Sequence, residues 1–196
     1  EPVGQQTAIL IAEHRAQILA TVVSRTQVID FPALGPEQMR TSLEAVGFTP
    51  AQAELARTLT DSVDSAAEWL VDDWFNSAEK AVSDIVTGTL KGDDTTFTHV
   101  QTALVPLAGE PARARVLLAM LAQSWRDILL GRTGDASVRF PGAGEWQRLS
   151  QRYTTAKLLE VLDIVLAAPQ RLQKNISFQT TVESTVLESQ FKLAGL

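Results

Sequence analysis

The sequence contains no cysteine and only two histidines among its 196 residues. Disulfide bonds, thiolate zinc sites and a cysteine nucleophile are therefore excluded for these residues. The histidines, His14 and His99, lie 85 positions apart, so a histidine-rich metal site is not expected. No apolar run reaches the ~20 residues that span a bilayer, and we expect no membrane segment. Hydrophobic residues make up 45% and charged residues 20% of the chain, which is typical of a globular protein with a sizeable core.

The sequence also lacks the motifs that bind nucleotides or carry out hydrolysis. Neither Gly-x-x-x-x-Gly-Lys-Ser/Thr nor Gly-x-Gly-x-x-Gly occurs, so no complete nucleotide site is expected. No Ser/His/Asp arrangement can be assembled, because Ser24 lies ten residues from His14 and nothing fixes their geometry. The pairs Asp72-Asp73 and Asp93-Asp94 could each bind a cation. Solvated carboxylates near a helix end are the favoured interpretation, because no further acidic ligands lie at matching spacing.

The net charge of −6 is distributed unevenly along the chain. Residues 1–100 carry 6 basic and 15 acidic side chains, whereas residues 101–196 carry 11 basic and 8 acidic ones. A dedicated nucleic-acid groove is normally strongly basic, so a helical nucleic-acid binder is disfavoured. The distribution suits contact with other proteins better.

The only β-strand signals lie near the start of the chain. Residues 7–12 form a nearly continuous apolar run, which is typical of a parallel strand covered on both faces. Residues 15–23 predict a short helix, and residues 27–31 predict a second strand that ends at Pro32. A buried strand needs neighbours to pair with, and the chain supplies almost none. We therefore expect the sequence to be a fragment of a longer protein.

From Gly35 onward the pattern is helical. Pro36 suits a first helical position, Gly47 ends that helix, and residues 49–52 have the spacing of a capping box. Together these signals predict three short helices over residues 36–46, 49–59 and 62–71. We expect them to form one small subdomain.

A larger all-helical unit is expected after this subdomain. Apolar residues recur at helical period in six segments, namely residues 75–90, 96–107, 111–130, 145–153, 154–168 and 177–191. Residues 131–144 contain four glycines and one proline and predict a loop. The four tryptophans fall mostly on apolar helix faces, where core packing is their ordinary role. The predicted fold is mainly α: the remnant of an α/β domain, a three-helix module and an α-helical bundle.

Residues 18–31, Ile-Leu-Ala-Thr-Val-Val-Ser-Arg-Thr-Gln-Val-Ile-Asp-Phe, resemble a segment of the AAA+ clamp-loader ATPases. In that family a Ser-Arg-Cys motif supplies an arginine that reaches the ATP of a neighbouring subunit. Ser24 and Arg25 match this motif, and Thr26 replaces the cysteine. The resemblance implies that Arg25 is an arginine finger acting in trans, with Ser24 and Thr26 as its motif neighbours. From the tripeptide alone, an arginine that anchors a loop by a surface ion pair is the alternative.

The resemblance extends over the whole chain. It implies an end of the AAA+ core over residues 1–32, including the sensor-1 strand, and a helical lid domain over residues 33–73. Residues 60–67 carry two acids and no arginine where ATP-binding subunits carry a sensor-2 arginine. This departure favours the delta-prime type of subunit, which does not bind ATP, over the gamma/tau type.

Residues 74–196 resemble the helical collar, or oligomerisation, domain of the same family. The signs are Leu-Lys-Gly-Asp at residues 90–93, Ser-Trp-Arg-Asp-Ile-Leu-Leu at residues 124–130, and the ending at residues 175–179. That ending makes Asn175, Ser177 and Gln179 possible collar-interface residues. An ordinary helix cap, in which Ser177 accepts a backbone amide, is at least as good an interpretation.

The resemblance implies a subunit of the bacterial DNA polymerase III clamp loader. Such a subunit assembles in the cytoplasm with gamma/tau and delta subunits to load the sliding β clamp onto primed DNA. It implies no cofactor and no metal in this chain, since neighbouring subunits bind the ATP, and no autonomous enzymatic activity is expected. A fragment of a gamma/tau-type ATPase and a stand-alone helical adaptor protein are the open alternatives.

Overall fold

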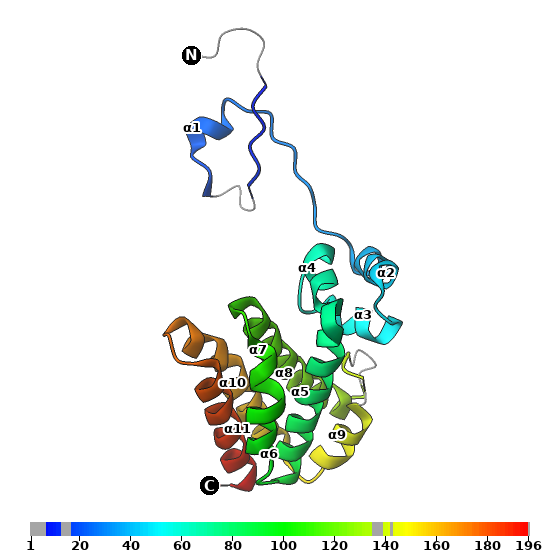
Figure 1. The fold of residues 1–196 in the computed structure, drawn as a ribbon, viewed down its shortest axis with the longest axis vertical. Coiled ribbons are helices and arrows are strands. Elements are labelled where there is room, and N and C mark those ends of the chain that lie inside the picture. Colours follow the sequence, from blue (N-terminus) through cyan, green and yellow to red (C-terminus); the bar gives the residue numbers. More distant parts are fainter. Residues whose placement is uncertain (1–6, 13–16, 135–138, 142, 196) are drawn as a thin grey trace. The chain divides into compact units, whose positions relative to one another are not determined.

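The computed structural model describes residues 7–12, 17–134, 139–141 and 143–195 (Figure 1). The chain divides into two units, Glu1–Ala33 and Leu34–Leu196. The expectation of a mainly α fold is confirmed. The α-helices are α1 (Ala20–Val23), α2 (Pro36–Val46), α3 (Pro50–Ala56), α4 (Val63–Ala67), α5 (Trp74–Lys91), α6 (Thr96–His99), α7 (Val105–Ala108), α8 (Pro111–Arg132), α9 (Ala143–Ser150), α10 (Thr155–Gln173) and α11 (Phe178–Ala194). None of the described helices has both the length and the apolar character needed to cross a membrane.

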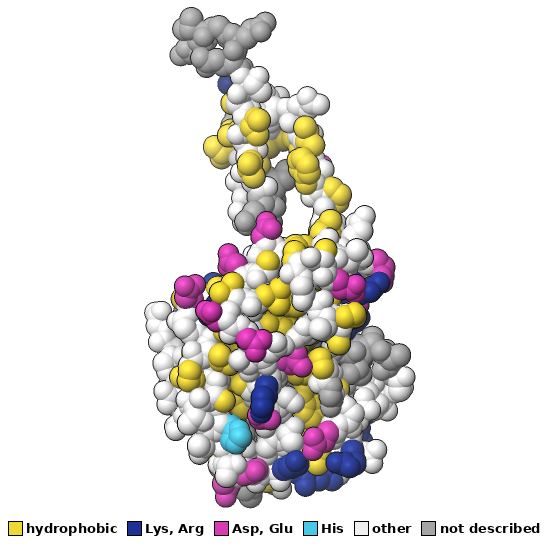
Figure 2. Space-filling view, turned by 45° about the vertical axis from the view of Figure 1, so that its right-hand side comes forward, with side chains coloured by type: hydrophobic (Ala, Val, Ile, Leu, Met, Phe, Trp, Pro, Cys, Tyr) yellow, Lys and Arg dark blue, Asp and Glu magenta, His cyan; other side chains and the backbone are white. Residues whose placement is uncertain are grey.

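The prediction of two strands in the first unit is wrong for this structure. The described residues 7–12 and 27–31 contain no strand, and no backbone hydrogen bond of either segment is found within the described part of the chain. A strand is stabilised by the ladder it forms with a neighbour, and among the described residues neither segment has one. Hydrophobic side chains are visible on the surface of this unit (Figure 2). Among the residues that suggested strands, Ile11 is 95% and Phe31 89% exposed. Of the helix expected over residues 15–23, α1 is the α-helical part that the structure describes.

Helices α2 and α3 begin and end where the local signals place them, with one exception. Gly47 ends α2 with a φ of 120°, a conformation that glycine adopts without a steric penalty. The Thr49 hydroxyl accepts the Gln52 N–H at 3.3 Å and the Gln52 side chain accepts the Thr49 N–H at 3.1 Å, so the capping box is confirmed. Helix α3 ends at Ala56, earlier than the predicted Leu59. The chain beyond it tightens into i→i+3 hydrogen bonds, as helix ends often do.

The third short helix is broken near its end. It consists of α4 and a 3-10 segment, Glu68–Asp73, in which Val71 is extended with a ψ of 134°. Asp72 and Asp73 follow in the left-handed region with φ values of 54° and 57°. This conformation costs a non-glycine residue about 1 kcal/mol. The two aspartates turn the chain directly into α5, and we call residues 71–73 the joint.

Three aromatic side chains pack helices α2–α4 against the start of α5. Trp69 stacks on Phe75 with ring centroids 5.9 Å apart, and Phe48 meets Phe75 edge-on at 5.1 Å. These rings belong to one hydrophobic core that runs through the whole unit 34–196. The finer division into a lid over residues 33–73 and a collar over residues 74–196 stays a prediction.

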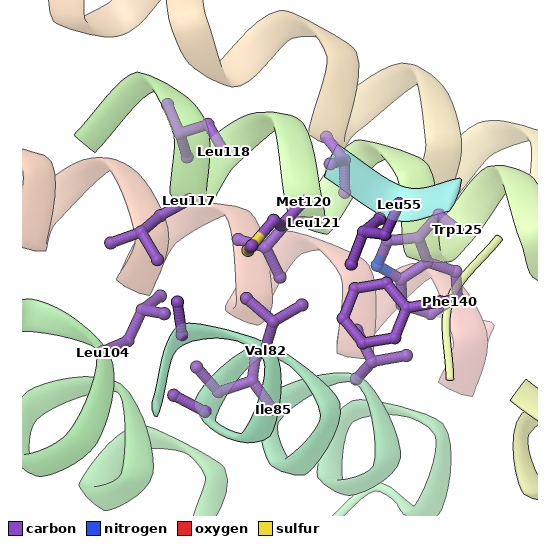
Figure 3. Packing of buried hydrophobic residues seen from close by; sticks show 14 of the residues in the cluster. Leu55, Val82, Ile85, Leu104, Leu117, Leu118, Met120, Leu121, Trp125 and Phe140 are labelled. Carbon is purple, nitrogen blue, oxygen red and sulfur yellow. The ribbon is translucent and has the colours of Figure 1, made fainter. Parts of the chain in front are cut away.

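The remaining helices form an antiparallel bundle (Figure 1). Val82 and Ile85 of α5 face Leu117, Met120 and Leu121 of α8 across the core, with Leu104 beside them (Figure 3). The core-packing role expected for the tryptophans is confirmed, because all four are at most 7% exposed. The ring N–H groups of two of them find acceptors: Trp74 donates to the Leu107 carbonyl and Trp146 to the Thr87 hydroxyl.

Two prolines modify the predicted helices. The helix expected over residues 96–107 contains a π-helical turn, Val100–Leu104, just before Pro106. Proline has no N–H, and its ring crowds the carbonyl four residues earlier, so the helix widens there. The helix expected to end at Ala168 continues through Pro169 to Gln173. Arg171 fixes this last turn to α11, since it donates to both carboxylate oxygens of Glu188 at 2.8 Å.

Candidate functional site

Arg25, the arginine singled out from the sequence, lies in a turn just after α1. The Ser24 N–H donates to the Ala20 carbonyl at 2.9 Å and the Arg25 N–H to the Val22 carbonyl at 3.1 Å. The Thr26 hydroxyl donates back to the same Val22 carbonyl at 3.1 Å. Ser24 and Thr26 thus use their polar atoms to close the turn, and both are exposed together with Arg25. Threonine in place of the family's cysteine fits this role, because its hydroxyl is a hydrogen-bond donor.

The guanidinium of Arg25 has the properties needed to contact an anion on another molecule. Within residues 7–12, 17–134, 139–141 and 143–195 it makes no ion pair and no side-chain hydrogen bond. A guanidinium is always charged and presents a planar set of donors that matches phosphate geometry. The ion-pair anchor considered from the tripeptide is therefore not found in the described part of the chain.

Residues 60–67, where the family's ATP-binding members carry a sensor-2 arginine, start helix α4. The Ser62 hydroxyl accepts the Ser65 N–H at 3.2 Å, and the Thr60 hydroxyl accepts the Ser62 N–H at 3.1 Å. Asp61 and Asp64 are exposed on this turn. The sequence has no Lys or Arg between Arg57 and Lys80, so this segment has no cation to offer a nucleotide phosphate.

Asn175 and Ser177 lie in the turn from α10 to α11 and Gln179 lies in the first turn of α11; all three are exposed. Asn175 is left-handed with a φ of 61°, and the Ser177 hydroxyl accepts the Thr180 N–H at 3.1 Å. The helix-cap interpretation of Ser177 is confirmed. The Gln179 amide donates to Glu183 at 2.9 Å. Their role at a subunit interface stays a prediction.

Gln101 of the π-helical turn also donates to Glu183, at 2.9 Å. The two amide donors, Gln101 first and then Gln179, lower the pKa of the Glu183 carboxyl. The turn between α10 and α11 is thereby tied to the helix that contains Gln101.

The acidic pairs lie at helix ends. Asp73 accepts the Asn76 side-chain amide, and Asp93 accepts the N–H and the hydroxyl of Thr95 at 2.8 Å each, which lowers its pKa. Within the described residues, no group of three or more His, Cys, Asp or Glu side chains is placed to hold a metal ion. His14 lies outside the described residues, so its distance to Ser24 is not part of the structure.

The structure reveals one buried charged group that sequence reasoning missed. Asp127 on α8 is 0% exposed, and one of its carboxylate oxygens accepts the Arg139 and Phe140 N–H groups at 2.8 and 2.6 Å. The other oxygen accepts the Gln123 amide at 2.6 Å. Burial raises the pKa of Asp127, although these three hydrogen bonds oppose the shift. The sequence did contain a signal for this group, because Asp127 is an acidic residue close to the apolar residues that form the inward face of residues 116–129.

Asp127 is linked through Arg139 to Glu54 on helix α3. The Arg139 guanidinium donates to Glu54 at 2.5 Å, and Arg57 donates to the same oxygen at 2.6 Å. The hydrogen bond from Arg57 and the charges of both arginines lower the pKa of Glu54, against a smaller effect of burial. Helices α3 and α8, far apart in the sequence, are therefore joined by two carboxylates and one arginine.

Fold and sites together define a mainly α-helical protein whose predicted site residues are exposed on turns. Its buried carboxylate, Asp127, holds the backbone of residues 139 and 140. The nucleotide-binding loops are absent from the sequence, as noted above.

Comparison with known proteins makes this class more specific. No family model matches the chain, and no solved structure gives a significant match. The chain is 26% identical over 190 residues to DNA polymerase III subunit delta' of Bacillus subtilis (strain 168). The match covers 95% of this chain and 57% of that protein, so the chain spans somewhat more than half the length of this relative. The resemblance stated from the sequence is confirmed.

Proposed function

We propose that this chain is a delta-prime-like part of the bacterial DNA polymerase III clamp loader. In this role it assembles in the cytoplasm with gamma/tau and delta subunits, and the assembled ring loads the sliding β clamp onto primed DNA. The observation that carries the proposal is the match to a delta' subunit along 95% of the chain. The mainly α architecture and the exposed turns with predicted site residues support it.

Arg25 is proposed to complete an ATP site on a neighbouring gamma/tau subunit. Its exposed guanidinium lies in a turn whose backbone is held by Ser24 and Thr26. An arginine supplied in trans to a γ-phosphate neutralises the charge that develops in phosphoryl transfer, an effect of roughly 10³–10⁵ in rate. ATP is thus a ligand of the neighbour, and the acidic segment at residues 60–67 argues against an ATP site of the gamma/tau type in this chain.

The AAA+ core end over residues 1–32, the lid over residues 33–73 and the collar over residues 74–196 are proposed as the working parts. The collar is the part expected to form the ring contacts, with Asn175, Ser177 and Gln179 at one edge. Exposed large apolar residues on α10 and α11 are consistent with protein contact: Leu159, Leu166, Leu187 and Phe191.

The first test mixes the chain with gamma/tau and delta and measures the mass of the product by size-exclusion chromatography with light scattering. A stoichiometric complex is expected. A well-folded chain that forms no complex at micromolar concentration would overturn the proposal and favour a stand-alone helical adaptor.

The second test examines Arg25 in the reconstituted ring. Arg25→Ala is expected to reduce the ATPase rate stimulated by clamp and primed DNA by at least ~10²-fold at that site, with unchanged incorporation into the ring. Arg126→Ala, which removes an exposed arginine from α8, is the matched control. Equal ATPase rates for the two variants would refute the finger role and leave the assembly role standing.

A further inference from the structure

Residues 139–141, which we call the strap, connect helix α8 to helix α3. The strap backbone is held on α8, because the N–H groups of Arg139 and Phe140 both donate to Asp127. The strap side chain is held on α3, because the Arg139 guanidinium donates to Glu54. The strap is thus held at two carboxylates: Asp127 on α8 accepts hydrogen bonds from its backbone, and Glu54 on α3 accepts one from its arginine side chain.

Apolar packing also connects α3 and α8 through the strap. Phe140 is 3% exposed and lies beside Leu55 of α3 and Trp125 of α8 (Figure 3). Its ring also meets Trp146 of α9 at 4.9 Å. The strap therefore fills the space between α3 and the bundle as well as bridging the two.

A second set of contacts between helices α2–α4 and the bundle lies close to the joint. Trp69 and Phe75, which stack on each other, lie only two residues before and after residues 71–73. Gln52 donates to Asn76, which donates to Asp73 of the joint itself. These contacts are near the point where the chain turns, whereas the strap is far from it along the sequence.

We propose that the strap is a conformational latch on helices α2–α4. While Asp127 and Glu54 hold Arg139, these helices keep one position on the bundle. When the strap is released, they pivot about the left-handed joint, where the aromatic contacts persist, and helices α10 and α11 stay folded. This inference concerns residues 34–196 alone and does not depend on the proposed function.

The test measures a distance across the joint in the chain itself. The sequence has no cysteine, so spin labels can be placed on two introduced ones, Ser65→Cys on α4 and Asp163→Cys on α10. Both positions are exposed. Arg139→Met and Asp127→Ala are expected to broaden the distance distribution that the parent chain shows as a single narrow peak.

Arg57→Met is the matched control, because it removes a partner of the same Glu54 carboxylate without touching the strap. It is expected to keep the narrow peak, as is Asp127→Asn, which retains an acceptor for the two strap amides. Hydrogen exchange gives a second readout, with amides of α3 exchanging about tenfold faster in Arg139→Met and those of α10 and α11 unchanged.

Three results would overturn the latch. The first is a narrow, unshifted distribution in both Arg139→Met and Asp127→Ala. The second is equal broadening in Arg57→Met, which would mean that any lost ion pair has this effect. The third is a parallel loss of protection in α10 and α11, which would make the strap part of one global unfolding unit.

Discussion

Replacement of Asp127 by alanine is the most informative single perturbation of this fold. The variant leaves the N–H groups of Arg139 and Phe140 without their acceptor at a position where Phe140 is 3% exposed. A buried donor without a partner costs about 1–3 kcal/mol. Two such donors give a loss of roughly 2–6 kcal/mol, with Gln123 retaining access to other partners because it is only partly buried. Against a typical stability of ~5–15 kcal/mol this is a large effect.

Asp127→Asn separates the loss of hydrogen bonds from the loss of charge. The asparagine oxygen can accept both strap amides, and its NH₂ group can donate to the Gln123 side-chain oxygen if that amide is turned over. The expected loss at pH 7 is therefore below about 1 kcal/mol. Urea unfolding of both variants, followed by tryptophan fluorescence and far-UV circular dichroism, measures the two free energies.

The raised pKa of Asp127 adds a dependence on pH with a definite sign. Since burial makes the native state bind the proton more readily than the unfolded state, protonation favours folding. This stabilising contribution is complete below the unfolded pKa of ~3.9 and is lost as pH rises through the higher native pKa. Relative to Asp127→Asn, the parent chain should gain stability as pH falls from 7. A loss of less than ~0.5 kcal/mol in Asp127→Ala, or equal losses in Ala and Asn, would refute the reasoning.

Three further substitutions test other parts of the structure. Glu54→Gln should cost about 0.5–1 kcal/mol at pH 7. Because the native pKa of Glu54 is lowered, its contribution is present above the unfolded pKa of ~4.3 and fades as pH falls through the native pKa, which urea unfolding at several pH values would show. Thr49→Ala removes the hydroxyl that caps α3 and should cost ~1 kcal/mol by urea unfolding, with Thr41→Ala on α2 as an exposed control. Asp72→Gly removes the steric penalty of a left-handed aspartate and should raise the midpoint of thermal unfolding, with a gain in stability of up to ~1 kcal/mol. A fall in this midpoint would argue against strain at the joint.

The local parts of this fold are those that the sequence determines by itself. Pro36, Gly47 and the Thr49–Gln52 pair act within one or two turns of chain, so the limits of α2 and the start of α3 follow from them directly. The apolar spacing in α5 and α8 likewise selects the faces that are buried, tryptophans included. The resemblance to clamp-loader subunits also came from the residues alone, and comparison bears it out.

Only the tertiary structure decides the features that depend on contacts between distant segments. Residues 7–12 and 27–31 have the composition of strands, but a strand requires a partner for its backbone, and within the described residues none is present. The break at residues 71–73 places Trp69 on Phe75, a pairing that no local propensity specifies. Asp127 and Glu54 acquire their roles because the fold brings Arg139 between them. A carboxylate is stable in such a place when donors from elsewhere in the chain converge on it, and the sequence pattern of a single helix carries no record of those donors.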